Sequence, residues 1–149
     1  MTVQDRIERE ISIEAPLERV WDLITETGWW VGDGDRTGQQ RRRDGDLEVV
    51  EDPKYGAFPM RVVSVDPRRY VSYRWASGFP GDDPVEGNST LVEFWLSEQD
   101  SGTLVRVVES GFGSLAVTDE ARESSVEGNT QGWASQLDLL KERAESVSV

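Results

Sequence analysis

The opening segment of the chain alternates apolar and charged positions. In residues 5–14, Ile7, Ile11 and Ile13 lie at even spacing with charged residues between them. Because successive side chains of a strand point to opposite faces, this spacing predicts a strand with one buried face. Pro16 then ends the strand and suits the first turn of a following helix.

The hydrophobic period changes directly after this proline. Leu17, Val20, Trp21 and Ile24 fall at i, i+3, i+4 and i+7. This spacing places them on one stripe of a helix, which we expect over residues 17–26. A glycine that follows such a stripe commonly ends the helix, and Gly28 is the expected break.

The middle of the chain predicts short strands separated by turns. Residues 31–46 contain four glycines and almost no apolar residue, so a loop is expected there, and a second long loop at 77–88. Turn residues at 66–69 and 100–102 predict a tight turn and a hairpin. The strands are expected at 46–51, 57–66, 69–76, 89–98 and 102–110.

The last segment again has helical spacing. Trp133, Leu137, Leu140 and Ala144 lie at i, i+4, i+7 and i+11, and residues 128–130 offer a helix start. The order is therefore strand, helix, a meander of about five strands, and a long helix. Neighbouring strands of a meander are antiparallel, and the helices must cover one face of the sheet. We expect a single α+β domain over residues 1–149.

Composition limits the chemistry that the chain could perform. The 149 residues include no cysteine and no histidine. Thiol nucleophiles, a Ser-His-Asp triad and an ordinary zinc site are thereby excluded. Acid–base chemistry would have to come from carboxylates, tyrosines, lysines or arginines, and no cofactor is expected.

The charge of the chain bears on its partners. Sixteen basic and 29 acidic residues give a formal charge of −13, which repels nucleic acid and anionic membranes. Residues 41–43 are the only basic cluster, but acidic residues follow at once, so we expect a solvated loop instead of a phosphate site. No signal sequence or apolar run of membrane-spanning length occurs, which favours a cytoplasmic protein without membrane insertion.

Five stretches of the chain carry a resemblance to a known group of proteins. They are residues 11–21, Gly28-Trp29-Trp30, residues 65–75, residues 103–112, and Gly132-Trp133 followed by residues 137–140. In this order they resemble the START-like (helix-grip, SRPBCC) superfamily, and within it the family named after the activator of heat-shock protein 90 ATPase. The resemblance implies a curved antiparallel sheet of about six strands wrapped around a long C-terminal helix. It also implies a cavity between them, which in other members holds lipids, steroids, polyketides or hormones.

Glu109 is the candidate for acid–base chemistry. It shares strand parity with Val105 and Val107, whereas Arg106 has the opposite parity. If the two valines face the core, Glu109 faces it too, beside apolar walls that disfavour a charged carboxylate. A proton-transfer or ligand role and a structural ion pair or hydrogen bond are both open from the sequence.

Aromatic residues dominate the candidate ligand site. Trp75 shares parity with Tyr73, which predicts an aromatic wall, and Trp95 is expected on the outer face of the sheet. Of the adjacent Trp29 and Trp30, one is expected to fill the core and the other to cover the pocket. The predicted ligand-binding residues are Trp30, Tyr73, Trp75, Val107, Glu109, Phe112 and Trp133.

A partial calcium motif occurs in the first loop but predicts no metal site. Residues 33–38 read D-x-D-x-T-G, with Asp44 at the twelfth position. A calcium loop of this kind ends in a bidentate glutamate between two helices. Here the last ligand is shorter, Arg36 opposes the cation and the flanking helices are missing. The glycines match neither a dinucleotide-binding fingerprint nor a P-loop.

Three functions from different classes follow. The first is binding of a small apolar or amphipathic molecule in the pocket. The alternative is a cyclase- or dehydratase-type enzyme acting on a polyketide-like substrate, with Glu109 and Tyr73 as its polar groups. The third is a co-chaperone-like interaction with a chaperone, which the family name implies, although well-studied chaperone activators carry a further domain. A monomer and a homodimer are both compatible with the sequence.

Overall fold

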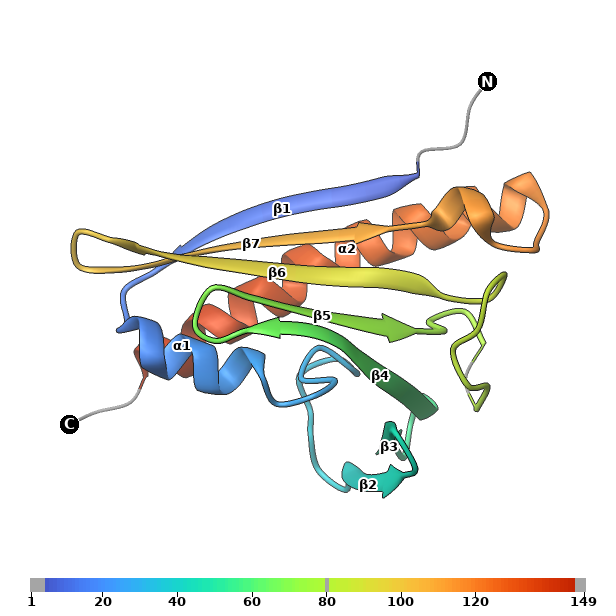
Figure 1. The fold of residues 1–149 in the computed structure, drawn as a ribbon, viewed down its shortest axis with the longest axis horizontal. Coiled ribbons are helices and arrows are strands. Elements are labelled where there is room, and N and C mark those ends of the chain that lie inside the picture. The colour runs from blue at the N-terminus through green and yellow to red at the C-terminus, as the bar shows by residue number, and fades with distance from the viewer. Residues whose placement is uncertain (1–4, 80, 147–149) are drawn as a thin grey trace.

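The computed structural model describes residues 5–79 and 81–146 (Figure 1). Its single antiparallel sheet has the strand order β1-β7-β6-β5-β4-β3-β2. The strands are β1 (Arg6–Ile13), β2 (Gln40–Asp44), β3 (Leu47–Asp52), β4 (Gly56–Asp66), β5 (Tyr70–Trp75), β6 (Thr90–Gln99) and β7 (Gly102–Ser110); the helices are α1 (Leu17–Ile24), the short 3-10 helix η1 (Phe112–Ser114) and α2 (Asp119–Glu145). The predicted α+β helix-grip fold is confirmed, with seven strands among the described residues instead of about six.

The long helix lies across one face of the sheet. Figure 1 shows α2 running behind β7 and β6, with α1 near its C-terminal end and β2 and β3 at the far edge of the sheet. The Arg19 side chain of α1 donates to the main-chain oxygens of Ala144 and Arg143, at 2.7 and 3.0 Å. These bonds join the two helices, so that both cover the same concave face.

The alternation that predicted β1 is visible in its burial. Ile7 and Ile13 are each 1% exposed, and Ile7 lies directly opposite Glu109 in the neighbouring strand β7. The first and last strands of the chain therefore pair with each other. This pairing places β7 between β1 and β6, with the Glu109 side chain buried.

Helix α1 ends before the glycine that was expected to stop it. The Thr25 hydroxyl donates to the Trp21 carbonyl at 2.8 Å, which caps the last turn. Gly28 follows with a φ of +70°, and a Cβ atom there would lie 2.4 Å from Val50 Cγ2. Glycine is thus required in the turn that leads from α1 into the Trp29-Trp30 pair.

The first predicted loop contains a strand that the hydrophobic pattern did not show. Strand β2 pairs with β3 at the edge of the sheet and is almost entirely polar. Arg41 Nε donates to the Thr27 carbonyl at 3.0 Å, and Arg42 forms an ion pair with Glu51 at 2.8 Å. The expectation of a loop at these arginines was therefore wrong, whereas Arg42 and Arg43 are solvent-exposed as expected. An edge strand with both faces polar has no apolar period by which to find it.

Helix α2 begins much earlier than residues 128–130. The Thr118 hydroxyl accepts a hydrogen bond from the Ala121 amide at 3.1 Å, and Asp119 and Glu120 occupy the first turn. An N-cap threonine followed by acidic residues is a normal helix start. The prediction missed it because Val126 is the one buried side chain before Trp133, so this half of the helix has no apolar stripe.

Tryptophans occupy both faces of the sheet. Trp29 is 1% exposed and packs against Phe94, with ring centroids 5.6 Å apart. Trp95 lies on the opposite, outer face as expected, where Arg106 covers its ring at 5.0 Å. No helix among the described residues is long and apolar enough to cross a lipid bilayer.

Candidate functional site

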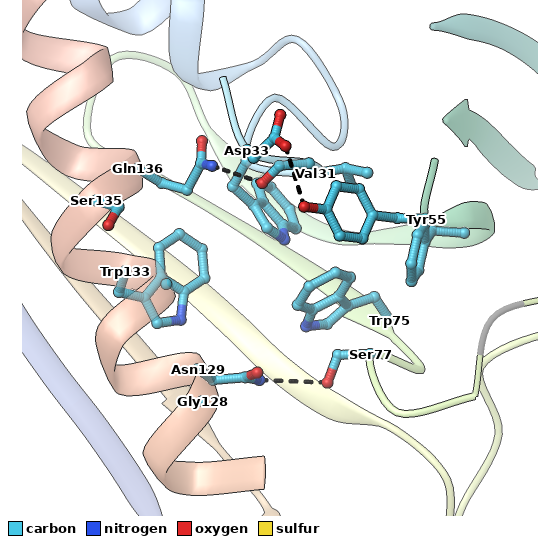
Figure 2. Close-up of a pocket in the computed structure, with 14 residues that line it drawn as sticks. Val31, Asp33, Tyr55, Trp75, Ser77, Gly128, Asn129, Trp133, Ser135 and Gln136 are labelled. Carbon is cyan, nitrogen blue, oxygen red and sulfur yellow. Dashed lines mark hydrogen bonds between the residues drawn. The ribbon is translucent and has the colours of Figure 1, made fainter. Parts of the chain in front are cut away.

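A pocket of about 360 Å³ lies between α2, the segment after α1, and the ends of β4 and β5 (Figure 2). Its wall is largely aromatic, with polar groups around it. The aromatic residues are Trp30, Tyr55, Phe58, Trp75 and Trp133; the polar ones are Asp33, Ser77, Asn129, Ser135 and Gln136. A pocket of this kind, mostly apolar with a few polar groups, is typical of small-molecule sites.

Two glycines of α2 leave room for this pocket. Gly128 and Gly132 lie one turn apart, on the same face of the helix, and both line the pocket. A Cβ atom at either position would meet nothing within 4 Å. Glycine destabilises a helix interior relative to alanine, so helix stability does not account for two glycines in one turn. The open space that they leave beside the helix does.

The tryptophan walls are tied to one buried carboxylate. Trp75 Nε1 on β5 donates to Glu109 Oε2 at 2.9 Å, and Trp133 Nε1 on α2 donates to Glu109 Oε1 at 2.9 Å. Thr90 Oγ1 and Asn129 Nδ2 donate to the same two oxygens, at 2.5 and 3.0 Å. Glu109 is 0% exposed. Four donors from three elements therefore converge on a group that lies behind the pocket wall.

The third tryptophan completes the wall from the segment after α1. Trp30 is 4% exposed, and its ring centroid lies 5.5 Å from that of Trp75 and 5.6 Å from that of Trp133. It forms part of the wall and does not project over the pocket as a cover. Trp29 fills the core, as expected of one member of the pair.

Hydrogen bonds order the mouth of the pocket. Asp33 Oδ2 accepts from Lys54 Nζ at 2.9 Å and from the Tyr55 hydroxyl at 3.1 Å. The Lys54 side chain, the Asp35 amide and the Tyr55 hydroxyl together lower the pKa of Asp33 to about 2. Gln136 Nε2 of α2 donates to the Gly32 carbonyl at 2.9 Å, which holds this segment against the helix.

The sequence-predicted site residues fall into three groups. Trp30, Trp75 and Trp133 line the pocket, and Glu109 contacts two of them from behind. The remaining three, Tyr73, Val107 and Phe112, lie in the core at 0–1% exposure.

Tyr73 is bound within the core. Its hydroxyl donates to the Ile24 carbonyl at 3.1 Å, and burial raises the pKa of Tyr73 above its ordinary range. The cyclase hypothesis assigned polar chemistry to Tyr73 and Glu109. The structure places these two side chains outside the set that lines the pocket.

Several lining residues were missed by sequence reasoning. Tyr55 directly precedes β4 and Phe58 lies near its start, where nothing in the alternation marks a pocket. Gly128 and Asn129 were read as a helix start, although two glycines and an asparagine inside a helix are a detectable anomaly. Asp33 was weighed as a calcium ligand. No group of three or more acidic side chains that could hold a metal occurs in the described ranges.

A curved antiparallel sheet that grips a long C-terminal helix and leaves a pocket between them defines a helix-grip protein of the START-like superfamily. Residues 14–145 match the family model described as Activator of Hsp90 ATPase homolog 1-like protein. The chain belongs to this family.

Solved structures of similar fold cover nearly the whole chain. Protein MLL2253 of Mesorhizobium loti aligns with a TM-score of 0.72 at 20% identity, over 97% of this chain and 99% of that one. The Aha1 dimer of Colwellia psychrerythraea aligns with a TM-score of 0.68 at 19% identity, over 96% and 98%. Protein BH1534 of Bacillus halodurans aligns with a TM-score of 0.68 at 24% identity, over 97% and 100%. At these identities the likeness concerns the fold. No curated protein sequence matches the chain.

Proposed function

We propose that this protein binds a small apolar or amphipathic molecule with a flat ring system in the pocket between the sheet and α2. The observation that carries the proposal is the fixed aromatic wall. Trp75 and Trp133 reach the pocket from different elements, yet their indole nitrogens share the Glu109 carboxylate, at 2.9 Å each. Side chains held in this way need little ordering when a ligand enters, which favours affinity.

The size and lining of the pocket support the same class of ligand. A volume of about 360 Å³ accommodates a molecule of a few fused rings, and ligand pockets of about 300–1,000 Å³ are usual. Aromatic walls contact flat apolar groups over a large area. The polar groups at the mouth, among them Ser135 and Gln136, suit a ligand with a polar end.

The fold is compatible with ligand binding and with cyclase-like catalysis, and the position of Glu109 favours binding. Its two oxygens already accept four hydrogen bonds. The side chain does not line the pocket itself, but it holds residues that do. A general acid or base must approach the substrate within hydrogen-bond distance. Glu109 serves better as a support for the wall than as a proton donor.

Native mass spectrometry of the freshly purified protein, beside its denatured mass, tests the proposal. We expect an extra mass in the native spectrum that denaturation removes. Gly132→Leu should abolish the extra mass, because the added side chain enters the open space at the pocket wall. Ala134→Leu is the matched control, since Ala134 lies on the exposed face of the same helix.

A second measurement covers the case in which a weak ligand is lost during purification. A panel of sterols, fatty acids and polyketides is added to the unliganded protein, and the melting temperature is recorded. A ligand that binds the native state raises it by mass action. Shifts that occur in the wild type and in Ala134→Leu but not in Gly132→Leu support the pocket. No shift with any compound, or equal shifts in all three proteins, contradicts the proposal.

A further inference from the structure

The residues that line the pocket carry negative charge only. None of the 14 residues that line it is a lysine or an arginine, and Asp33 lies at its mouth. Glu109 lies directly behind the wall, and its partners among the described residues are two indoles, a hydroxyl and an amide, none of them cationic. Each of these partners donates, which suits a carboxylate that accepts. Hydrogen bonds from neutral donors stabilise the carboxylate but leave its net negative charge beside the pocket.

The aromatic wall strengthens this preference. The faces of aromatic rings carry a negative quadrupole that attracts cations placed within about 6 Å. Trp75 and Trp133 both donate their N–H groups to Glu109. Donation to a negative acceptor polarises each indole toward its ring, which makes the ring face more attractive to a positive charge. Phe58 adds a further ring, with its centroid 5.9 Å from that of Trp75.

A cation of the protein itself already occupies the mouth of the pocket. Lys54 Nζ lies 2.9 Å from Asp33 Oδ2 and 5.3 Å from the centroid of the Tyr55 ring. Asp33 and Tyr55 are both pocket residues, whereas Lys54 is not among the lining residues. The mouth thus holds an ammonium group by one carboxylate and one aromatic face. A ligand ammonium could use the same two groups if Lys54 moved into solvent, where it is already 68% exposed.

We propose that the ligand of this pocket is positively charged, a protonated or quaternary amine attached to a flat apolar body. The apolar body lies among the three tryptophans, and the ammonium lies at the mouth beside Asp33 and the Tyr55 ring. This inference rests on the proposed function, because it names the charge of the molecule that the pocket binds. An anionic ligand such as a fatty acid would instead meet Glu109 and Asp33 with no basic lining residue to receive it.

A pair of probes that differ in charge but hardly in shape tests the inference. They are (3-hydroxyphenyl)trimethylammonium and 3-tert-butylphenol, titrated at 0.15 M salt to screen the distant charges of the chain. The indole N–H resonances of Trp75 and Trp133 report binding at the wall. We expect the cation to bind roughly 3- to 30-fold more tightly than the neutral probe. Equal or tighter binding of the neutral probe overturns the inference and leaves the proposed function intact. If neither probe moves the indole signals, the inference fails, and the panel of sterols, fatty acids and polyketides then decides the proposed function separately.

Variants at the mouth separate a local site from the general charge of the protein. Asp33→Asn should lower the ratio of cation to neutral affinity, whereas Asp35→Asn should leave it unchanged. Both residues lie in the same exposed loop, but Asp35 does not line the pocket and its carboxylate accepts from the Thr37 amide. Lys54→Met should raise the affinity for the cation, because it removes the internal competitor for Asp33. Equal losses in Asp33→Asn and Asp35→Asn would show a long-range charge effect and would contradict the proposed site.

Discussion

The two halves of α2 meet the rest of the molecule in opposite ways. From Trp133 onward the helix buries Trp133, Gln136, Leu137, Leu140 and Ala144. From Asp119 to Gly132 it buries Val126 alone and carries the two glycines that face the pocket. One half is packed against the core, whereas the other leaves space beside the sheet. The same helix therefore supplies both the stability of the fold and the opening that a ligand could fill.

This difference shows how a small domain can keep a pocket without weakening its core. A void lined by large aliphatic side chains would cost stability in proportion to its volume. Here the space lies beside residues of the helix that have no side chain to bury, and the opposite wall is held by hydrogen bonds to Glu109. Substitutions in the packed half should therefore lower stability, whereas alanines at the glycines of the open half should not.

The largest effect is expected in the packed half. Leu140 is 0% exposed, and Leu140→Ala should lower the free energy of unfolding by about 3–5 kcal/mol, through lost burial and the cavity left behind. Urea denaturation followed by circular dichroism measures it. Val85→Ala, at a side chain that is 58% exposed, should change stability by about 0.5 kcal/mol or less. Similar losses in the two variants would mean that α2 does not pack on the core at Leu140.

The next effect is expected where the two halves of the helix join. Glu109 accepts from Asn129 in the first half and from Trp133 in the second. Glu109→Gln replaces an acceptor by an amide group that donates, so some of the four buried donors lose their partner. We expect a loss of about 2–4 kcal/mol in unfolding free energy and a change in the tryptophan emission spectrum.

The exposed Glu127→Gln is the matched control for that substitution, because it makes the same change of side chain at a solvent-exposed position of α2. It should leave both the stability and the emission spectrum close to those of the wild type. If Glu109→Gln were as stable as this control, the network would not hold the pocket wall.

A gain in stability is expected in the open half. Gly132→Ala removes the entropic cost of a glycine inside a helix, and the new methyl group meets nothing within 4 Å. We expect the free energy of unfolding to rise by about 0.5–1 kcal/mol. The same denaturation experiment measures it, with Gly128→Ala as a second example. A loss of stability at either position would show that the helix has no room there.

The contrast within α2 also explains which features the sequence predicted. The strand from Ile7 to Ile13 and the helical stripe from Trp133 to Ala144 were predicted correctly, because the periodic spacing of their apolar residues follows from the burial of one face. The polar edge strand β2 and the first half of α2 bury little, so they leave no such period. Glu109 was placed inside by its parity with Val105 and Val107, but its four partners come from three separate elements. Contacts between separate elements depend on tertiary packing, and the local spacing of residues in one sequence does not predict them.

The smallest effect concerns the mouth of the pocket, and it depends on pH. Hydrogen bonds from Lys54, the Asp35 amide and Tyr55 lower the pKa of Asp33 to about 2, against about 3.9 for an ordinary aspartate. Because the folded-state pKa is the lower one, the ionised group stabilises the native state at neutral pH. That contribution is complete above about pH 4 and is lost as the pH falls toward about 2. Asp33→Asn should therefore reduce stability slightly at pH 7, and its difference from the wild type should shrink between pH 4 and pH 2. Thermal unfolding across this range measures the difference, and a gap that stayed constant with pH would show that the Asp33 bonds act on something other than its ionisation.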